Sequence, residues 1–368
     1  MLNKQASQGF SILELMIALL LGVVVVAGIV QLFVGNSRTY EIVNAQSRLQ
    51  ENARYGFEFI SRAARSTGYF GCAPEDDKVA KHLAGAWNLI PEYNMTESVG
   101  GWESNGDGSY APNDLTTLPR SESGLNVNVH IAGNGIDRNE LSDDADILVF
   151  RSLRRPVARL AATLQPDADP VVSTPGGDPN FAVDDVVLIA DCEQAALFKV
   201  TQVAATTDET TLQRAVTATG NPFENTANIT LFSGDIIPAT LSVVGRSYGA
   251  DATIGVFETV FFFVAESAMA DNQGNPVNAL WQKVGNAAPV ELIQGIADMQ
   301  ILYGVDSTIA DGIANVNQYV PFDEVGDPAD VVAVQVTLDV NSVEPLAEFG
   351  NQPLTRTYRK TIHVRNAG

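Results

Sequence analysis

The first seventy residues show two hydrophobic patterns that both predict a helix. Residues 15–30 contain no polar side chain, and together with residues 10–14 and 31–34 they reach the roughly 20 residues that a membrane-spanning helix needs. From residue 37 to residue 66, apolar side chains recur at spacings of three and four, the pattern of a helix with one buried face: Ile42, Ala45, Leu49, Ala53, Phe57, Ile60 and Ala64. The sequence therefore predicts one continuous helix from Phe10 to about Ser66.

Past residue 66 the pattern changes. Residues 68–139 are rich in Gly, Asn, Ser, Asp and Pro without clear periodicity, which predicts long loops with short elements. Segments rich in branched and aromatic residues then predict strands, at residues 146–153, 184–192, 196–204, 210–216, 239–249, 255–265, 331–340 and 357–366. Residues 289–306 predict a short helix or turn that runs into a strand. The expected fold class is α+β, with one long helix and a mostly β body.

Composition and charge narrow the possible partners. The chain has 368 residues, enough for one large or two smaller domains, and 45% of them are hydrophobic, as in an ordinary globular protein. Its net charge is -22, and because residues 1–66 carry six Lys and Arg against four Glu, the acidic excess lies in the remainder. Nucleic acid binding needs a basic surface, so we expect no nucleic acid partner.

The two cysteines, Cys72 and Cys192, are too few for a zinc site made of cysteine alone. In a protein exported across a membrane, such a pair favours a disulfide. The bond would close a loop of about 120 residues, which is worth roughly 4–5 kcal/mol in the chain-entropy model. Two unpaired buried thiols are the alternative.

Glu14 is the most unusual residue of the apolar segment, because a carboxylate in a membrane-length helix is costly and usually functional. A simple alternative is that its side chain reaches back to the membrane interface. The order of Gly9, Phe10, a glutamate four residues later and then an apolar helix resembles the class III signal of type IV pilins and type II secretion pseudopilins.

This resemblance implies a processing step and an assembly role. A prepilin peptidase would cut between Gly9 and Phe10 on the cytoplasmic side and methylate the new amine of Phe10. Glu14 would then pair with that amine, in its own or a neighbouring subunit, and help to set the register of assembly. The expected parts are a leader at 1–9, a transmembrane and assembly half of the helix at 10–34, its amphipathic half at 35–66, and a periplasmic, mostly β body at 67–368.

Four stretches resemble one branch of this superfamily, the PilW-type minor pilins of type IV pilus assembly: Ser66–Cys72, Val186–Val203, Val290–Asp306 and Arg359–Asn366. Two of them contain Cys72 and Cys192, which supports their pairing. The resemblance implies a pilin-like fold, in which the long helix packs on a mostly antiparallel sheet with long loops. It also implies a non-enzymatic protein without a cofactor.

The same resemblance implies where the protein acts and with what. It would span the inner membrane once, with a periplasmic body, and then move to the pilus tip at the cell surface, where it helps to prime pilus assembly. Its partners would be other minor pilins, the major pilin and a large tip adhesin. A type II secretion pseudopilin, with the same leader and fold, is the nearest alternative.

One short motif points to a different class of protein. The sequence from Gly245 to Gly249, GRSYG, fits the G-x-S-x-G nucleophile elbow of hydrolases, which needs a strand before it and a helix after it. Asp251 and His363 would complete the triad order, and Ser247 would then serve a membrane-anchored periplasmic hydrolase. Because the residues that follow have a β pattern, we expect a turn between strands and no catalytic residue.

Metal sites are not predicted. His82 and His130 have no second ligand at zinc spacing. The acidic clusters at residues 137–146 and 322–330 have oxygen ligands of the kind that calcium uses, but they lack the spacing and glycine of an EF-hand. We expect both clusters to be solvated acidic loops.

Overall fold

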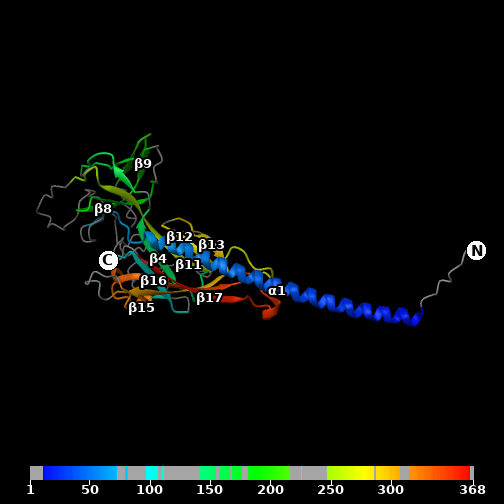
Figure 1. Cartoon of the computed structure of the whole chain (residues 1–368). Coiled ribbons are helices and arrows are strands. Elements are labelled where there is room, and N and C mark those ends of the chain that lie inside the picture. The colour runs from blue at the N-terminus through cyan, green and yellow to red at the C-terminus, as the bar shows by residue number, and fades with distance from the viewer. Residues whose placement is uncertain are drawn as a thin grey trace, which may run out of the picture.

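The structure is a computed structural model of the chain. It describes residues 11–72, 79–81, 97–106, 110–111, 141–154, 157–165, 168–175, 181–215, 225, 247–285, 287–306 and 315–364. A long helix leaves a β body, and its N-terminal half projects away from that body (Figure 1).

Helix α1 runs without interruption from Ile12 to Ser66. Its N-terminus is capped by Ser11, whose Oγ accepts a hydrogen bond from the Leu13 N–H at 3.3 Å. No proline interrupts these 55 residues, and at 1.5 Å per residue they extend over roughly 80 Å. The predicted helix is confirmed over this range, whereas its expected first residue, Phe10, lies outside the described residues.

The strands form a large sheet of 13 strands and a small sheet of four, and every pairing but one is antiparallel, as the predicted fold class requires. The large sheet contains β1 (Val79–Lys81), β2 (Val99–Ser104), β3 (Tyr110–Ala111), β4 (Ile147–Leu153), β5 (Ala158–Leu160), β6 (Val171–Ser173), β7 (Val186–Ala190), β8 (Ala195–Lys199), β9 (Gln202–Ala205), β10 (Glu209–Gln213), β11 (Thr253–Glu266), β12 (Asn278–Val284) and β13 (Val290–Gln294). The small sheet has the order β15 (Gln318–Val320), β14 (Ile296–Val305), β16 (Val331–Asn341) and β17 (Thr355–His363).

The long strand β11 connects two parts of the body. Its first residues pair with β5 and β7, in the region that lies farthest from the projecting half of α1 (Figure 1). Its later residues pair with β4 and β12, beside the helix. Short 3-10 helices, at Phe322–Glu324, Pro328–Asp330 and Ala347–Phe349, lie next to the strands of the small sheet.

Two predicted segments are wrong in detail. In residues 289–306 the expected turn into a strand is present at Gly295, whose φ is 80°, but the residues before it form strand β13 and no helix. β13 and β14 lie in different sheets. A Cβ at Gly295 would lie 2.6 Å from the Asn341 backbone oxygen, so the crossing requires glycine. Residues 196–204 form two strands, β8 and β9, instead of one.

Other differences concern segments with weak patterns. Strand β12, whose sequence NALWQKV mixes polar and apolar residues, was not predicted, and it is ordered by its pairing with β11 and β13. Most of the strand expected at 239–249 lies outside the described residues, as does most of the loop-rich region 68–139.

The main hydrophobic core lies between α1 and the two sheets. Six of the seven α1 residues that the spacing predicted to be buried are buried, and Ile42 is half-buried. They pack against apolar side chains of β4, β11, β14 and β16. Gly56 lets the helix approach closely, since a Cβ there would lie 3.1 Å from Leu338 Cδ1. The body therefore depends on one face of the second half of α1.

A disulfide joins Cys72 to Cys192, with Cα atoms 4.5 Å apart. Cys72 follows the end of α1, and Cys192 lies in the turn between β7 and β8. Phe70, near Cys72, stacks on Phe257 of β11, with ring centroids 5.8 Å apart. The bond ties the end of the helix to the part of the body that lies farthest from the start of α1 (Figure 1).

Candidate functional site

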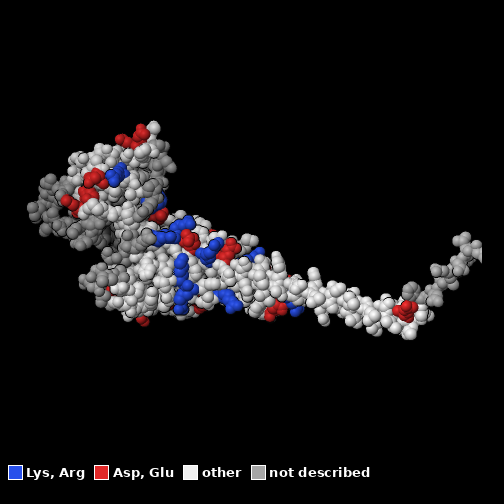
Figure 2. Space-filling view, viewed as in Figure 1, with Lys and Arg blue, Asp and Glu red and all other residues white. Residues whose placement is uncertain are grey.

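The exposed half of α1 is the first candidate surface. Every large apolar side chain from Ile12 to Val34 is exposed, and Glu14 is the only charged residue before Arg38 in the helix. Figure 2 shows this part of the helix as white atoms with a single acidic group near its start. Within the described residues, this is the one helix long and apolar enough to cross a membrane. Such a surface is stable only when lipid or other apolar helices cover it.

Glu14 lies in the first turn of α1, three residues after the Ser11 cap. A carboxylate at this position is favoured by the positive end of the helix dipole. Its predicted partner, the amine of Phe10, and the predicted cleavage site at Gly9 lie outside the described residues. Cleavage, methylation and the pairing of Glu14 therefore stay predictions.

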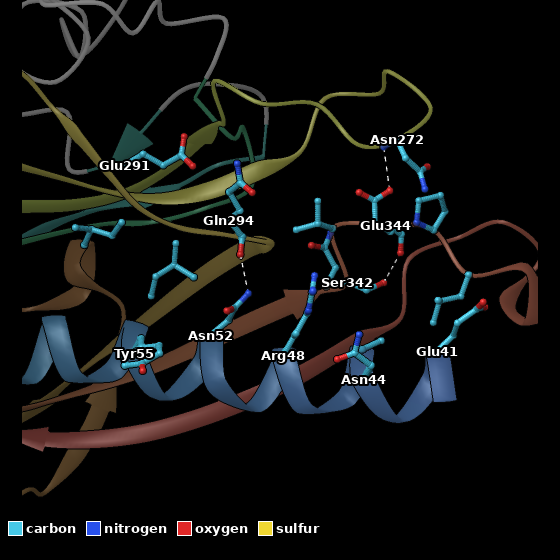
Figure 3. A pocket seen from close by; sticks show the side chains of 17 residues that line it. Glu41, Asn44, Arg48, Asn52, Tyr55, Asn272, Glu291, Gln294, Ser342 and Glu344 are labelled. Carbon is cyan, nitrogen blue, oxygen red and sulfur yellow. Dashed lines mark hydrogen bonds between the residues drawn. The ribbon is translucent and has the colours of Figure 1, made fainter. Parts of the chain in front are cut away.

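A polar groove of about 680 Å³ lies where α1 meets the body (Figure 3). One wall is the helix face that carries Asn44, Arg48 and Asn52, and the other is formed by β13 and the segment that follows β16. Asn52 Nδ2 donates a hydrogen bond to the Gln294 backbone oxygen at 2.9 Å. The Glu344 carboxylate accepts one from the Asn272 N–H at 2.9 Å. The groove is therefore lined by amides and charged groups, and two of them, Asn52 and Glu344, already form hydrogen bonds within the protein.

An ion pair marks the point where the helix leaves the body. Arg38 Nε lies 2.9 Å from Glu348 Oε1, in the 3-10 helix Ala347–Phe349. The described α1 residues before Arg38 are all exposed. Arg38 lies four residues after Val34, so the membrane-length segment ends one helical turn before the body begins.

Two carboxyl groups, that of the buried Asp146 and that of the half-buried Glu103, lie at the end of β2. Asp146 Oδ1 accepts a hydrogen bond from the Ser104 N–H at 2.9 Å, and Oδ2 accepts one from the Ile301 N–H at 2.8 Å. Burial is the main cause that raises the pKa of Asp146 to about 6. Burial, and after it the charge of Asp146, raise the pKa of Glu103 to about 7.

This arrangement corrects one expectation about the acidic clusters. Asp146, the last residue of the cluster at 137–146, is buried and holds two strands together through its carboxylate, so it is not part of a solvated loop. Asp323, from the cluster at 322–330, is close enough to raise the pKa values of both Glu103 and Asp146. In the part of the chain that the structure describes, no group of three acidic, His or Cys side chains is placed to hold a metal ion.

The GRSYG motif does not form a nucleophile elbow. Ser247 is exposed, and its backbone oxygen accepts a hydrogen bond from Gln194 Nε2 at 3.4 Å. The next residue pairs with Leu164 in an isolated bridge, and the chain then turns directly into strand β11, where a hydrolase would have a helix. His363 lies on β17 in the small sheet. His82 and His130 lie outside the described residues.

Comparison with known proteins gives one match. Residues 261–367, less than a third of the chain, match the family model described as Type IV Pilus-assembly protein W. The matched segment runs from the second half of β11 through the whole small sheet, and so contains most of the strands on which α1 packs, although not β4. No curated protein and no solved structure matches the chain.

The match and the helix together point to a class of protein. They support a protein of type IV pilus assembly, which interacts with other pilus components. The apolar helix indicates membrane anchoring, and the pilus family indicates a periplasmic or surface location.

Proposed function

We propose that this chain is a minor pilin, a non-enzymatic subunit that helps to prime type IV pilus assembly and sits at the pilus tip with other minor pilins. One observation carries the proposal. A single helix joins an exposed apolar half with one carboxylate to a half that is packed into a body matching a pilus-assembly family. When such a subunit leaves the membrane, the apolar helices of neighbouring subunits are the surface that replaces lipid.

Glu14 sets the position of one subunit's helix along the helix of its neighbour. An unpaired carboxylate among apolar helices is costly, so the subunit is most stable where Glu14 meets a positive charge. Cleavage between Gly9 and Phe10 would create that charge at the start of the helix, one turn before Glu14. We assign the methylated amine of a neighbouring subunit as its partner.

The size of the body favours the tip. The body, residues 67–368, carries in its described part a large sheet of 13 strands in addition to the small sheet of four. Such a body is hard to stack along a filament, and it fits more easily at the end. The partners we propose are other minor pilins, the major pilin and a large tip adhesin, with the prepilin peptidase acting before assembly.

The first test is the N-terminal mass of the full chain recovered from its native membrane. We expect a chain that begins at N-methylated Phe10. A chain that begins at intact Met1 would remove the role given to Gly9, Phe10 and Glu14, and would contradict the proposal.

The second test replaces the carboxylate. We expect Glu14→Ala to be inserted in the membrane at the wild-type level but to lose most of the pili, counted by electron microscopy. Gln31→Ala is the matched control, because it removes another polar side chain from the same exposed half, and it should leave piliation unchanged. Normal piliation in Glu14→Ala would contradict the proposed pairing of Glu14 with the amine of a neighbouring subunit. Loss of type II secretion with normal pili would assign the chain to a secretion system instead.

A further inference from the structure

The small sheet has two edges that differ in how they are closed. At one edge, β14 is covered by the short strand β15 and by Asp146, whose N–H donates to the Met299 oxygen at 2.8 Å and whose carboxylate accepts the Ile301 N–H. At the other edge, β17 is the last strand of the sheet. One edge is therefore sealed by side chain and backbone, and the opposite one ends in a strand of nine residues.

The register of β17 shows which of its backbone groups are unused. Just beyond its two ends, the Ser342 N–H donates to the Leu354 oxygen at 2.8 Å and the Val364 N–H donates to the Val332 oxygen at 3.0 Å. Pairing between these points has no shift, so even-numbered residues bond β16 and odd-numbered residues point outward. Among the described residues, no partner is found for the outward backbone groups of Thr355, Thr357, Arg359, Thr361 and His363.

This open edge is basic in an acidic protein. β17 carries Arg356, Arg359 and Lys360, which are all exposed, and no acidic residue. Lys360 Nζ lies 3.0 Å from Ser61 Oγ, which places the strand beside the last turns of α1, where Arg62 and Arg65 are exposed. Together α1 and β17 hold eight of the 22 Lys and Arg of the chain but four of its 44 Asp and Glu. Figure 2 shows basic groups along the helix, with acidic groups between them, and further basic groups on the body beside it.

We propose that the open edge of β17 is a docking site for an extended, acidic segment of a partner protein, which adds to the small sheet as a further strand. Backbone hydrogen bonds to the outward groups would supply affinity, and the basic side chains on both faces of the edge would select acidic sequences. The inference rests on the proposed function in one respect, since it takes the partner to be another protein of pilus assembly.

Two other occupants fit the edge less well. In an antiparallel pair of two β17 strands, the basic side chains of both copies would face one another, and like charges on opposed strands are destabilising. A membrane surface is too far away. Lys360 lies at the level of Ser61, which is about 40 Å along the helix from Val34, where the apolar segment ends.

The test measures strand addition on the full chain in lipid nanodiscs. The probe is a synthetic ten-residue peptide that alternates Glu with Val, and its control carries Lys in place of Glu. We expect the acidic peptide to bind at least about tenfold more tightly than the basic one, a difference of about 1.4 kcal/mol, by fluorescence anisotropy. On binding, the outward amides of Thr357, Arg359 and Thr361 should become protected from hydrogen exchange.

Variants separate backbone pairing from general attraction. The double variant Thr357→Pro, Thr361→Pro removes two outward N–H groups, and proline is tolerated on an edge strand when its nitrogen faces away from the sheet. The matched control, Thr357→Val with Thr361→Val, removes the same hydroxyls and keeps the N–H groups. We expect the proline variant to lose peptide binding and the valine variant to keep it, both with the wild-type melting temperature. If the proline variant has a lower melting temperature than the wild type, its loss of binding is not used. The test of strand addition is then whether peptide binding protects the outward amides of β17 from hydrogen exchange in the valine variant.

Each of three results would overturn the proposal. The first is that peptide binding does not protect the β17 amides from hydrogen exchange. The basic side chains would then serve only to prevent edge-to-edge aggregation of the sheet. The second is equal affinity for both peptides, and the third is self-association of the chain that the proline variant abolishes. The N-terminal mass of the chain distinguishes this failure from failure of the proposed function, because processing at Phe10 does not depend on β17.

Discussion

The two halves of α1 are continuous in backbone but differ in surroundings. From Ile12 to Val34 all side chains are exposed, and the large ones are apolar except for Glu14 and Gln31. From Ala45 to Ala64, one face is buried in the main core, while Arg54 and Arg62 on other faces are exposed. The apolar face of the second half is thus covered by the body of the same chain. The apolar surface of the first half must be covered by lipid or by neighbouring subunits.

This difference teaches where stability and function separate. A change on the packed face alters the folding of the body, because it leaves a cavity in a core that is already formed. A change on the exposed half leaves the body intact and acts on membrane insertion or assembly. Three predictions test this separation, beginning with the largest expected effect.

Leu49→Ala should destabilise the body strongly. Leu49 is fully buried between the helix and the sheets, so removal of its side chain should lower the free energy of unfolding by about 2–5 kcal/mol. The measurement is thermal unfolding of the full chain in detergent, followed by the near-ultraviolet signal of the aromatic core. Leu20→Ala, on the exposed half with 66% of its surface accessible, is the matched control and should leave the transition unchanged. Equal effects of the two substitutions on the transition would contradict the separation between the packed and the exposed half of the helix.

Acid should stabilise the body and leave the exposed half of the helix unaffected. The raised pKa values of Glu103, about 7, and Asp146, about 6, mean that the folded state holds these protons more tightly than the unfolded state does. This contribution is complete below pH about 4, and it is lost as the pH rises through 6 and 7. Melting temperatures of the full chain between pH 4 and pH 8 should therefore fall with increasing pH on account of this cluster.

Two substitutions assign that pH dependence. Glu103→Gln keeps the size of the side chain without its charge, so it should raise the melting temperature at pH 8 by a few degrees and change little at pH 4. Asp146→Asn should lower it at every pH, because an amide nitrogen would then face one of the two backbone N–H donors. A pH profile that Glu103→Gln leaves unchanged would show that other groups control the response.

The smallest effect is expected at the junction of the two halves. The side chain of Arg38 is 59% exposed, and its ion pair with Glu348 is worth less than about 1 kcal/mol. Arg38→Ala should therefore leave the melting temperature nearly unchanged and increase hydrogen exchange at residues 38–42. Arg62→Ala, which breaks a pair within the helix, is the control for loss of a surface charge. Slower exchange at the junction in Arg38→Ala would contradict this role.

Much of the fold could be predicted because local patterns of hydrophobic and polar residues determine it. The spacing of apolar residues indicated the extent of α1 and the buried face from Ala45 to Ala64, and runs of branched residues indicated β4, β7, β11, β16 and β17. Elements whose pairing decides their conformation were missed or misjudged. β12 has a mixed pattern, and β13 was expected to be a short helix or turn, whereas its pairing with β12 places it in a sheet.

By itself, the sequence determined that one long helix carries an apolar half with a single carboxylate, Glu14, because the period of a helix and the length of a membrane span are local properties. Only the tertiary structure decided which edges and charges meet. It buried Asp146 against β2 and β14, sealing one edge of the small sheet, and left β17 open beside the basic end of α1. These arrangements join residues that are far apart in the chain, and local hydrophobic patterns contain no information about such contacts.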